Sequence, residues 1–137
     1  RGLKRVGLRA GEDARVHAYE RMTLFLERVK PANLITRFND NLAMHEFVFL
    51  TEKSIQEEFD YNASQQLYVS KTSWNNIVIS KNQLIQVLHS SAKALGDNAT
   101  LEEFKTVFLM NYINEGDFIK ENIEELRKEF LLLSLNN

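Results

Sequence analysis

Residues 17–29 read HAYERMTLFLERV, and this stretch decides the fold. Its large apolar side chains recur at intervals of three and four residues, which is the period of an amphipathic α-helix and not of a strand. These side chains are Tyr19, Met22, Phe25, Leu26 and Val29. Pro31 lacks a backbone N–H donor, so the helix is expected to end near Val29 or Lys30. The stretch therefore predicts a core helix.

Leu24 departs from this pattern. It lies on the polar side of the same helix, between Glu20 and Glu27, each of which is followed by an arginine. The charged residues on that side suit a face in contact with water, whereas a large apolar side chain such as leucine is not expected on such a face. We expect Leu24 to contact either a second helix or a second chain.

The length and composition of the chain indicate one small domain. A chain of 137 residues with one proline is long enough to bury a core of its own. The absence of cysteine excludes disulfides and thiolate metal sites, and it is compatible with a reducing compartment. No apolar run approaches the roughly 20 residues that cross a bilayer, so this fragment is expected to be soluble. It opens on Arg1 and not on methionine, and we expect a further segment upstream.

Charge is distributed unevenly along the chain. Residues 1–30 hold eight cations and four anions, although the net charge of the whole chain is −2. Residues 1–11 also contain three glycines and are predicted to form a partly flexible basic arm, with a helix starting near Glu12. The cations of this arm are Arg1, Lys4, Arg5 and Arg9. Two interpretations remain open, a solvated terminus or a segment that contacts a membrane surface or phosphate groups.

The rest of the chain, residues 12–137, predicts a single all-α domain, an irregular bundle of about five helices. After the first helix, a short turn follows Pro31 and a second helix covers about residues 42–61. Residues 62–72 are expected to be an ordered connector. Later helix boundaries are marked by Ser70 or Ser73 as an N-cap, Gly96 as a terminator, the capping-box spacing of Thr100 and Glu103, and an interruption at Gly116.

We find no pattern that indicates chemistry. Helical bundles that hold two irons carry a carboxylate three residues before each ligand histidine, and His17, His45 and His89 all lack one. No serine lies in a nucleophile elbow, and there is no glycine-rich phosphate loop. We therefore expect no cofactor, no metal and no enzymatic activity. Nucleic acid is not an expected partner either, since the chain beyond residue 30 is acidic.

Apolar side chains outside the helical stripes are the main functional signal. A monomer cannot easily bury all of them, so self-association or binding of a protein partner is the leading expectation. The candidates are Leu24, Phe49, Leu50, Ile79, Leu109, Met110 and Leu131.

Two stretches stand out, AYERMTLFLERV at residues 18–29 and EFDYNASQQLYVS at residues 58–70. The first is followed by Pro31, Asn33, Leu34 and Ile35, and the second by Trp74. Together they resemble an uncharacterised family of bacterial membrane-anchored helical proteins. The resemblance implies a transmembrane helix upstream, a charged segment, and then this domain at the cytoplasmic face of the inner membrane. Residues 1–9 would then flank the anchor, which agrees with the cation excess found on the cytoplasmic side. No catalytic residue is implied.

The second stretch leaves two interpretations open for its aromatic side chains. Tyr61, Tyr68 and Trp74 either pack the connector onto the bundle or line a small binding groove. The sequence as a whole favours a non-enzymatic interaction or scaffold domain. The alternative is contact with anionic lipid or nucleic acid through the basic arm.

Overall fold

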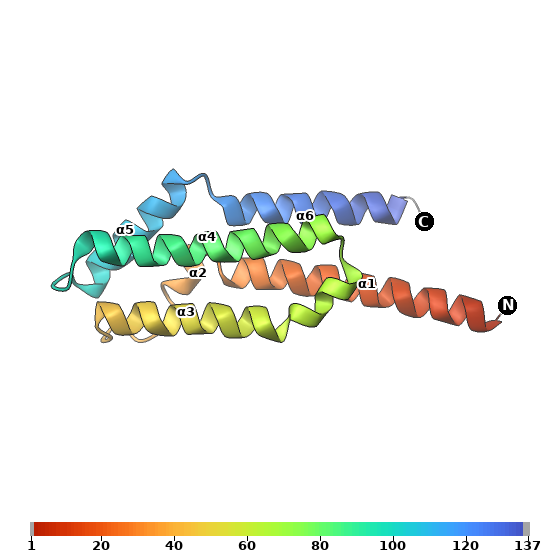
Figure 1. Cartoon of the computed structure of the whole chain (residues 1–137), viewed down its shortest axis with the longest axis horizontal. Helices are drawn as coiled ribbons and strands as arrows, with labels where there is room; N and C mark the ends of the chain where they lie inside the picture. The colour runs from red at the N-terminus through yellow and green to blue at the C-terminus, as the bar shows by residue number, and fades with distance from the viewer. Residues whose placement is uncertain (1, 136–137) are drawn as a thin grey trace.

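The computed structural model describes the backbone of residues 2–135 and the side chains of residues 10–135. Seven helices follow one another in this part of the chain, and it contains no strand (Figure 1). They are α1 (Gly2–Arg28), α2 (Pro31–Leu34), α3 (Met44–Tyr61), the 3-10 helix η1 (Ala63–Tyr68), α4 (Lys71–Leu95), α5 (Leu101–Asn114) and α6 (Phe118–Leu135). The prediction of an all-α irregular bundle is confirmed.

The first helix is longer than the sequence suggests. Its backbone is helical from Gly2 onward, so the expected start near Glu12 was wrong. Glycine costs a helix only about 1 kcal/mol relative to alanine, and extending an existing helix is far easier than nucleating a new one. A well-packed helix over residues 17–28 can therefore propagate backward through Gly11.

The helix boundaries follow the capping residues. The Ser73 backbone N–H donates to Ser70 Oγ at 3.0 Å, which identifies Ser70 and not Ser73 as the N-cap of α4. Thr100 and Glu103 form the reciprocal capping box of α5. Gly96 follows α4 with φ of 78°, a conformation that glycine adopts without strain. Within the predicted connector, residues 67–69 form the end of η1 and the residue after it.

Four long helices lie along the length of the molecule, and α5 crosses them at one end (Figure 1). α1 packs against α6, while α4 contacts α3, α5 and α6. α1 and α6 run in opposite directions (Figure 1), and Tyr19 of α1 contacts Phe130 and Glu129 near the C-terminal end of α6. In the described residues no helix combines the length with the apolar character needed to cross a bilayer.

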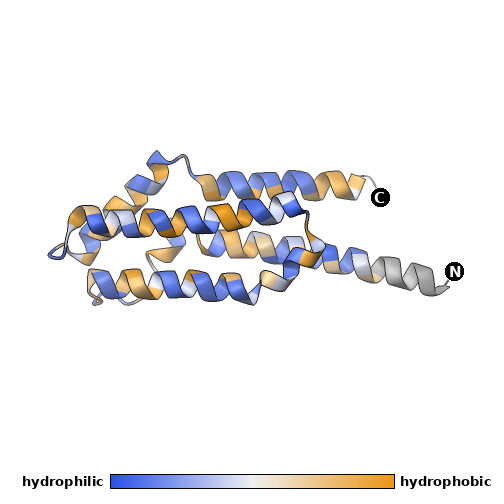
Figure 2. Ribbon diagram, viewed as in Figure 1, coloured by the Kyte–Doolittle hydropathy of each residue, from blue (hydrophilic) through white to orange (hydrophobic). Residues whose placement is uncertain are grey.

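The predicted stripe of α1 forms the centre of the core. Tyr19, Met22, Phe25, Leu26 and Val29 are all buried. Each fully buried large apolar side chain contributes roughly 1.5–3 kcal/mol relative to an exposed one. Apolar residues nevertheless remain at the surface, and the C-terminal end of α6 is visibly apolar in Figure 2. The exposed leucines at that end are Leu131, Leu132 and Leu135.

Candidate interaction surface

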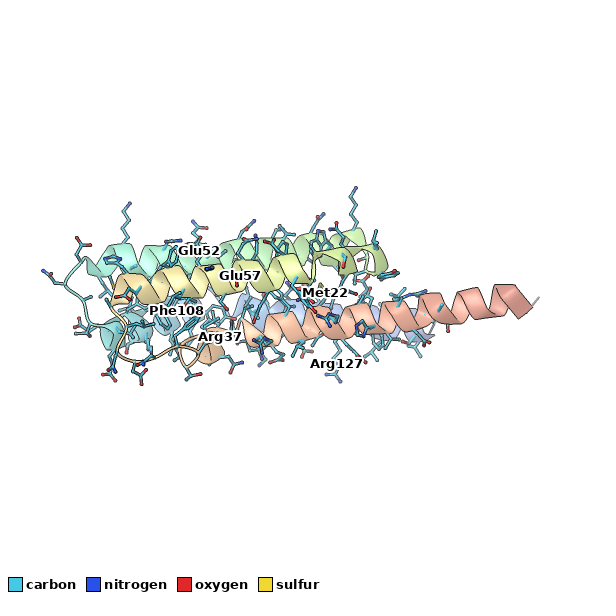
Figure 3. All side chains as sticks on the ribbon, turned by 90° about the horizontal axis from the view of Figure 1, so that it is seen from below. Met22, Arg37, Glu52, Glu57, Phe108 and Arg127 are labelled. Carbon is cyan, nitrogen blue, oxygen red and sulfur yellow. The ribbon has the colours of Figure 1, made fainter. Side chains whose placement is uncertain are left out.

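An elongated apolar groove runs between α1 and α6, and we call it the α1/α6 groove. It has a volume of about 470 Å³. From α1 it is lined by Val16, Tyr19, Glu20, Thr23, Leu24 and Glu27, and from α6 by Ile123, Leu126, Arg127 and Phe130. Most of its surface is apolar, and its charged groups stand at the rim. In Figure 3, Arg127 projects outward while Met22 lies between the helices.

A carboxylate fixes the walls of the groove. The Tyr19 hydroxyl donates to Glu129 Oε1 at 2.8 Å, and the Ser73 hydroxyl donates to Glu129 Oε2. Burial, with the neighbouring Glu129 carboxylate as the second cause, raises the pKa of the Tyr19 phenol above its ordinary range. Tyr19 therefore remains a protonated donor. One glutamate thus joins α1, α4 and α6.

Aromatic contacts support the same region. The ring centroids of Tyr19 and Phe130 lie 5.5 Å apart, and the two rings are tilted. Phe130 is only partly buried, because no third helix of the described part of the chain covers the side of the α1–α6 pair on which it lies. The groove is thus a surface feature with a rigid floor.

Leu24 stands on the crest between two hollows. It is 57% exposed, and it lines both the α1/α6 groove and a second hollow of about 350 Å³ on the other side of α1. We call this second hollow the α1/α3 depression. Its lining comprises Arg21, Leu24, Phe25, Arg28, Glu57, Glu58, Tyr61 and Asn62. The sequence expectation that Leu24 faces away from its own core agrees with this placement.

Tyr61 is the most exposed aromatic side chain beside this crest. It is 76% exposed, and the Arg21 guanidinium carbon lies 5.2 Å from its ring centroid. Arg21 Nε also donates to Asn62 Oδ1 at 3.0 Å. A cation over a tyrosine face and a hydrogen bond together hold the end of α3 against α1.

On α1 itself, the charges around Leu24 are separated by sign, because Glu20 and Glu27 line the α1/α6 groove and Arg21 and Arg28 line the α1/α3 depression. The neighbouring helices add the opposite sign to each hollow, Arg127 of α6 to the groove and Glu57 and Glu58 of α3 to the depression. Arg28 Nη2 lies 2.6 Å from Glu58 Oε1, and this contact raises the pKa of the guanidinium. Exposed pairs of this kind contribute about 0–1 kcal/mol to stability. This pair therefore contributes little to folding.

The other interaction candidates lie on different faces. Phe49, Ile79 and Met110 are exposed, on α3, α4 and α5, and none of them lines the α1/α6 groove, while Leu50 and Leu109 are partly buried. Those two leucines are partly covered because the irregular bundle packs against more than one side of α3 and of α5. Leu131 is exposed near the C-terminal end of α6.

Tyr61 and Tyr68 of the second stretch that resembles the family, and Trp74 after it, do not meet in a common groove. Trp74 stacks on Phe59 with 5.2 Å between ring centroids, Tyr61 lies beside Arg21, and Tyr68 is 44% exposed at the end of η1. Trp74 therefore anchors the start of α4. Of the basic arm, Arg1 lies outside the described residues, as do the side chains of Lys4, Arg5 and Arg9, so its role stays a prediction.

Two histidines and the buried Lys81 have local polar partners. His45 pairs with Asp97 at 3.1 Å and His89 with Glu52 at 2.9 Å. Among the side chains that the structure describes, no group of three histidine or carboxylate residues could hold a metal ion. The buried Lys81 ammonium lies 4.4 Å from the Phe59 ring centroid and donates to Gln56 Oε1 at 3.2 Å.

Sequence reasoning missed most of the groove. It singled out Leu24 but gave no indication that Val16 and Thr23 of α1 would lie opposite Ile123, Arg127 and Phe130 of α6. The missing information was which helix pairs with α1, since the groove exists only between the two. The signal that could have pointed to it is the run of leucines at residues 131–133, more apolar than one covered face requires.

Comparison with known proteins gives one match. The model of a family of unknown function, DUF7935, matches residues 8–132. This range includes both stretches that resemble an uncharacterised helical family, and that resemblance is confirmed. No curated protein and no solved structure matches the chain.

Proposed function

Because the chain belongs to DUF7935, a family of unknown function, no activity can be carried over from relatives, and we propose from its surface that it is a protein-interaction module. The observation that carries this proposal is the α1/α6 groove. It is apolar along its floor and charged along its rim, which is the pattern of a groove that binds an amphipathic helix.

The rigidity of the groove supports the proposal. The Glu129 carboxylate accepts hydrogen bonds from hydroxyl groups on α1 and α4, so the groove is formed before a partner arrives. A preformed site loses less conformational entropy on binding than one that must be ordered. The same bonds occupy both carboxylate oxygens of Glu129, which leaves this partly buried acid committed to structure and supports a non-enzymatic role.

Site-specific photo-crosslinking tests the proposal. A benzoylphenylalanine is placed at position 24 in the groove or at position 79 on α4, where the native side chains are 57% and 59% exposed. In the cells that naturally make the protein, we expect adducts from position 24 and not from its matched control. Equal adducts from both positions, or none from position 24, would contradict the proposal.

We further propose, on the family resemblance, that the domain works at the cytoplasmic face of the bacterial inner membrane. The cation excess of residues 1–9 supports this location. Fractionation of the native protein tests it, and recovery in the soluble fraction would contradict it. If the basic arm itself holds lipid or nucleic acid, that binding should weaken steeply between low and physiological salt.

A further inference from the structure

We propose that the partner of this surface is a second copy of the chain, with the two α1 helices side by side and parallel about a two-fold axis that passes Leu24. This inference rests on the proposed function and names its partner. Two independent features support it, the separation of charge around Leu24 and the match between an exposed tyrosine and the groove.

Helix geometry places the four charges around Leu24 on two edges. Residues at i−4 and i+3 lie on one side of residue i, and residues at i−3 and i+4 lie on the other. Relative to Leu24, the first pair is Glu20 and Glu27, and the second is Arg21 and Arg28. The structure agrees, because the glutamates line the α1/α6 groove and the arginines line the α1/α3 depression. α1 therefore has an acidic edge and a basic edge.

The charges select the direction of the second helix. When the two-fold axis runs parallel to α1, the acidic edge of each copy meets the basic edge of the other. Glu20 then faces Arg21 of the second copy, and Glu27 faces its Arg28. In the antiparallel arrangement Glu20 would face Glu27, and the arginines would face each other. Like charges in contact oppose association, so only the parallel pair is complementary.

The arginines remain able to bind across the interface. Arg28 is more than half exposed although Nε and Nη2 both donate to Glu58 Oε1. A guanidinium carries five N–H donors in one plane, so donors are left for a second carboxylate.

The shapes on either side of Leu24 also match. The same rotation places the α1/α3 depression of one copy over the α1/α6 groove of the other. Tyr61 is the exposed side chain of that depression, and its contact with Arg21 sets its height along α1. Arg21 is level with the middle of the groove, which extends from Val16 to Glu27. Tyr61 of the second copy is therefore positioned to fill the groove, and tyrosine is a preferred anchor at interfaces.

Engineered cysteines test the arrangement, since the chain contains none of its own. His17 is exposed and lies two helical turns before Leu24 on the same stripe. In the parallel pair, the two thiols of His17→Cys meet and form a disulfide under mild oxidation. In an antiparallel pair they would lie about 21 Å apart along the axis. Leu24→Cys should cross-link in either direction, and Ile79→Cys measures random collision.

The expected result is a disulfide dimer from His17→Cys and Leu24→Cys and none from Ile79→Cys. Cross-linking of Leu24→Cys alone would overturn the parallel arrangement. Absence of both would overturn self-recognition. In that last case photo-crosslinked adducts at position 24 with the mass of another protein would leave the proposed function standing, whereas absence of any adduct would remove both.

Charge exchange gives a second test that does not depend on cysteine chemistry. Glu20→Arg with Glu27→Arg makes both edges basic, and we expect at least about tenfold weaker self-association, measured by light scattering over a dilution series. Mixing this variant with one carrying Arg21→Glu and Arg28→Glu should restore a dimer of the two. Unchanged association of the first variant would overturn the proposal, and thermal melting verifies that each variant folds.

Discussion

The end of the molecule where α5 crosses and the face where α1 meets α6 use similar side chains with opposite results. At the α5 end, Phe47, Phe104 and Phe108 are fully buried. The ring centroids of Phe47 and Phe104 lie 5.9 Å apart, and those of Phe104 and Phe108 lie 5.8 Å apart. At the α1–α6 face, Phe130 is partly exposed and more than half of Leu24 is exposed.

The difference lies in the number of elements that meet. α5 contacts α2, α3 and α4, so its aromatic rings have neighbours on several sides. α1 and α6 pair with each other, but the outer side of the pair has no covering helix among the described residues. Two helices alone leave a groove, and a third is needed to close it. The open face is thus the part of the core that a second chain can complete.

The largest expected effect is at the closed end. Phe108→Ala removes a fully buried ring and should lower the free energy of unfolding by about 3–5 kcal/mol, since the rigid surroundings leave a cavity. Phe130→Ala is the matched change at the open face. Its loss should be clearly smaller in urea titrations of the monomer, and equal losses would show that the two regions are packed alike.

Alkaline pH should weaken the floor of the groove. The pKa of Tyr19 is raised in the folded state, so the phenol ionises first in the unfolded chain. Its stabilising contribution is complete below about pH 10 and is lost as pH rises above that value, by roughly 1.4 kcal/mol per pH unit. Tyr19→Phe should therefore flatten the fall in unfolding free energy between about pH 10 and 11. The same slope in both proteins would refute this role for Tyr19.

A smaller effect is expected at the connector. Tyr68 ends η1, which contacts α1 and α3, and slightly more than half of its side chain is buried. Tyr68→Ala should lower stability by about 1 kcal/mol, or about 3 °C in melting temperature, because it loosens the connector. Leu67→Ala, at a more exposed neighbour, is the control. Unchanged melting of the Tyr68 variant would favour a binding role for that residue.

Substitution of Leu24, on the crest between the two hollows, is expected to have the smallest effect on folding. It is expected to have the largest effect on assembly. Leu24→Lys should change unfolding free energy by no more than about 0.5 kcal/mol, since the side chain is exposed, and leave helicity unchanged. The same change should abolish self-association, seen as a lower mass by light scattering across a hundredfold dilution series. Ile79→Lys should leave the mass as it is. A Leu24 variant of unaltered mass would argue against a self-interface.

Local signals predicted the helices well. The spacing of apolar residues from Tyr19 to Val29 identified the buried side of α1, and Thr100 with Glu103 marked the start of α5. These features depend on residues within one or two helical turns, so one sequence contains all the information. The start of α1 was missed because propensity at Gly11 is a weak term beside a helix already formed.

Features that depend on helix pairing were beyond the sequence. Leu24 could be recognised as misplaced, but the hollows on either side of it come from α6 and α3. Leu109 looked available for a partner and is partly buried. Lys81 lies over Phe59, a contact between α4 and α3 that the spacing within either helix does not indicate. In each case the neighbour is distant in sequence, and periodicity does not say which helix will supply it.

The bond between Tyr19 and Glu129 joins residues 110 positions apart. During synthesis α1 leaves the ribosome well before α6, so the side of α1 that faces α6 has no neighbour until α6 has been made. The α1/α6 groove therefore does not exist until both of its walls are present. A ligand that needs both walls can bind only after α6 has folded against α1.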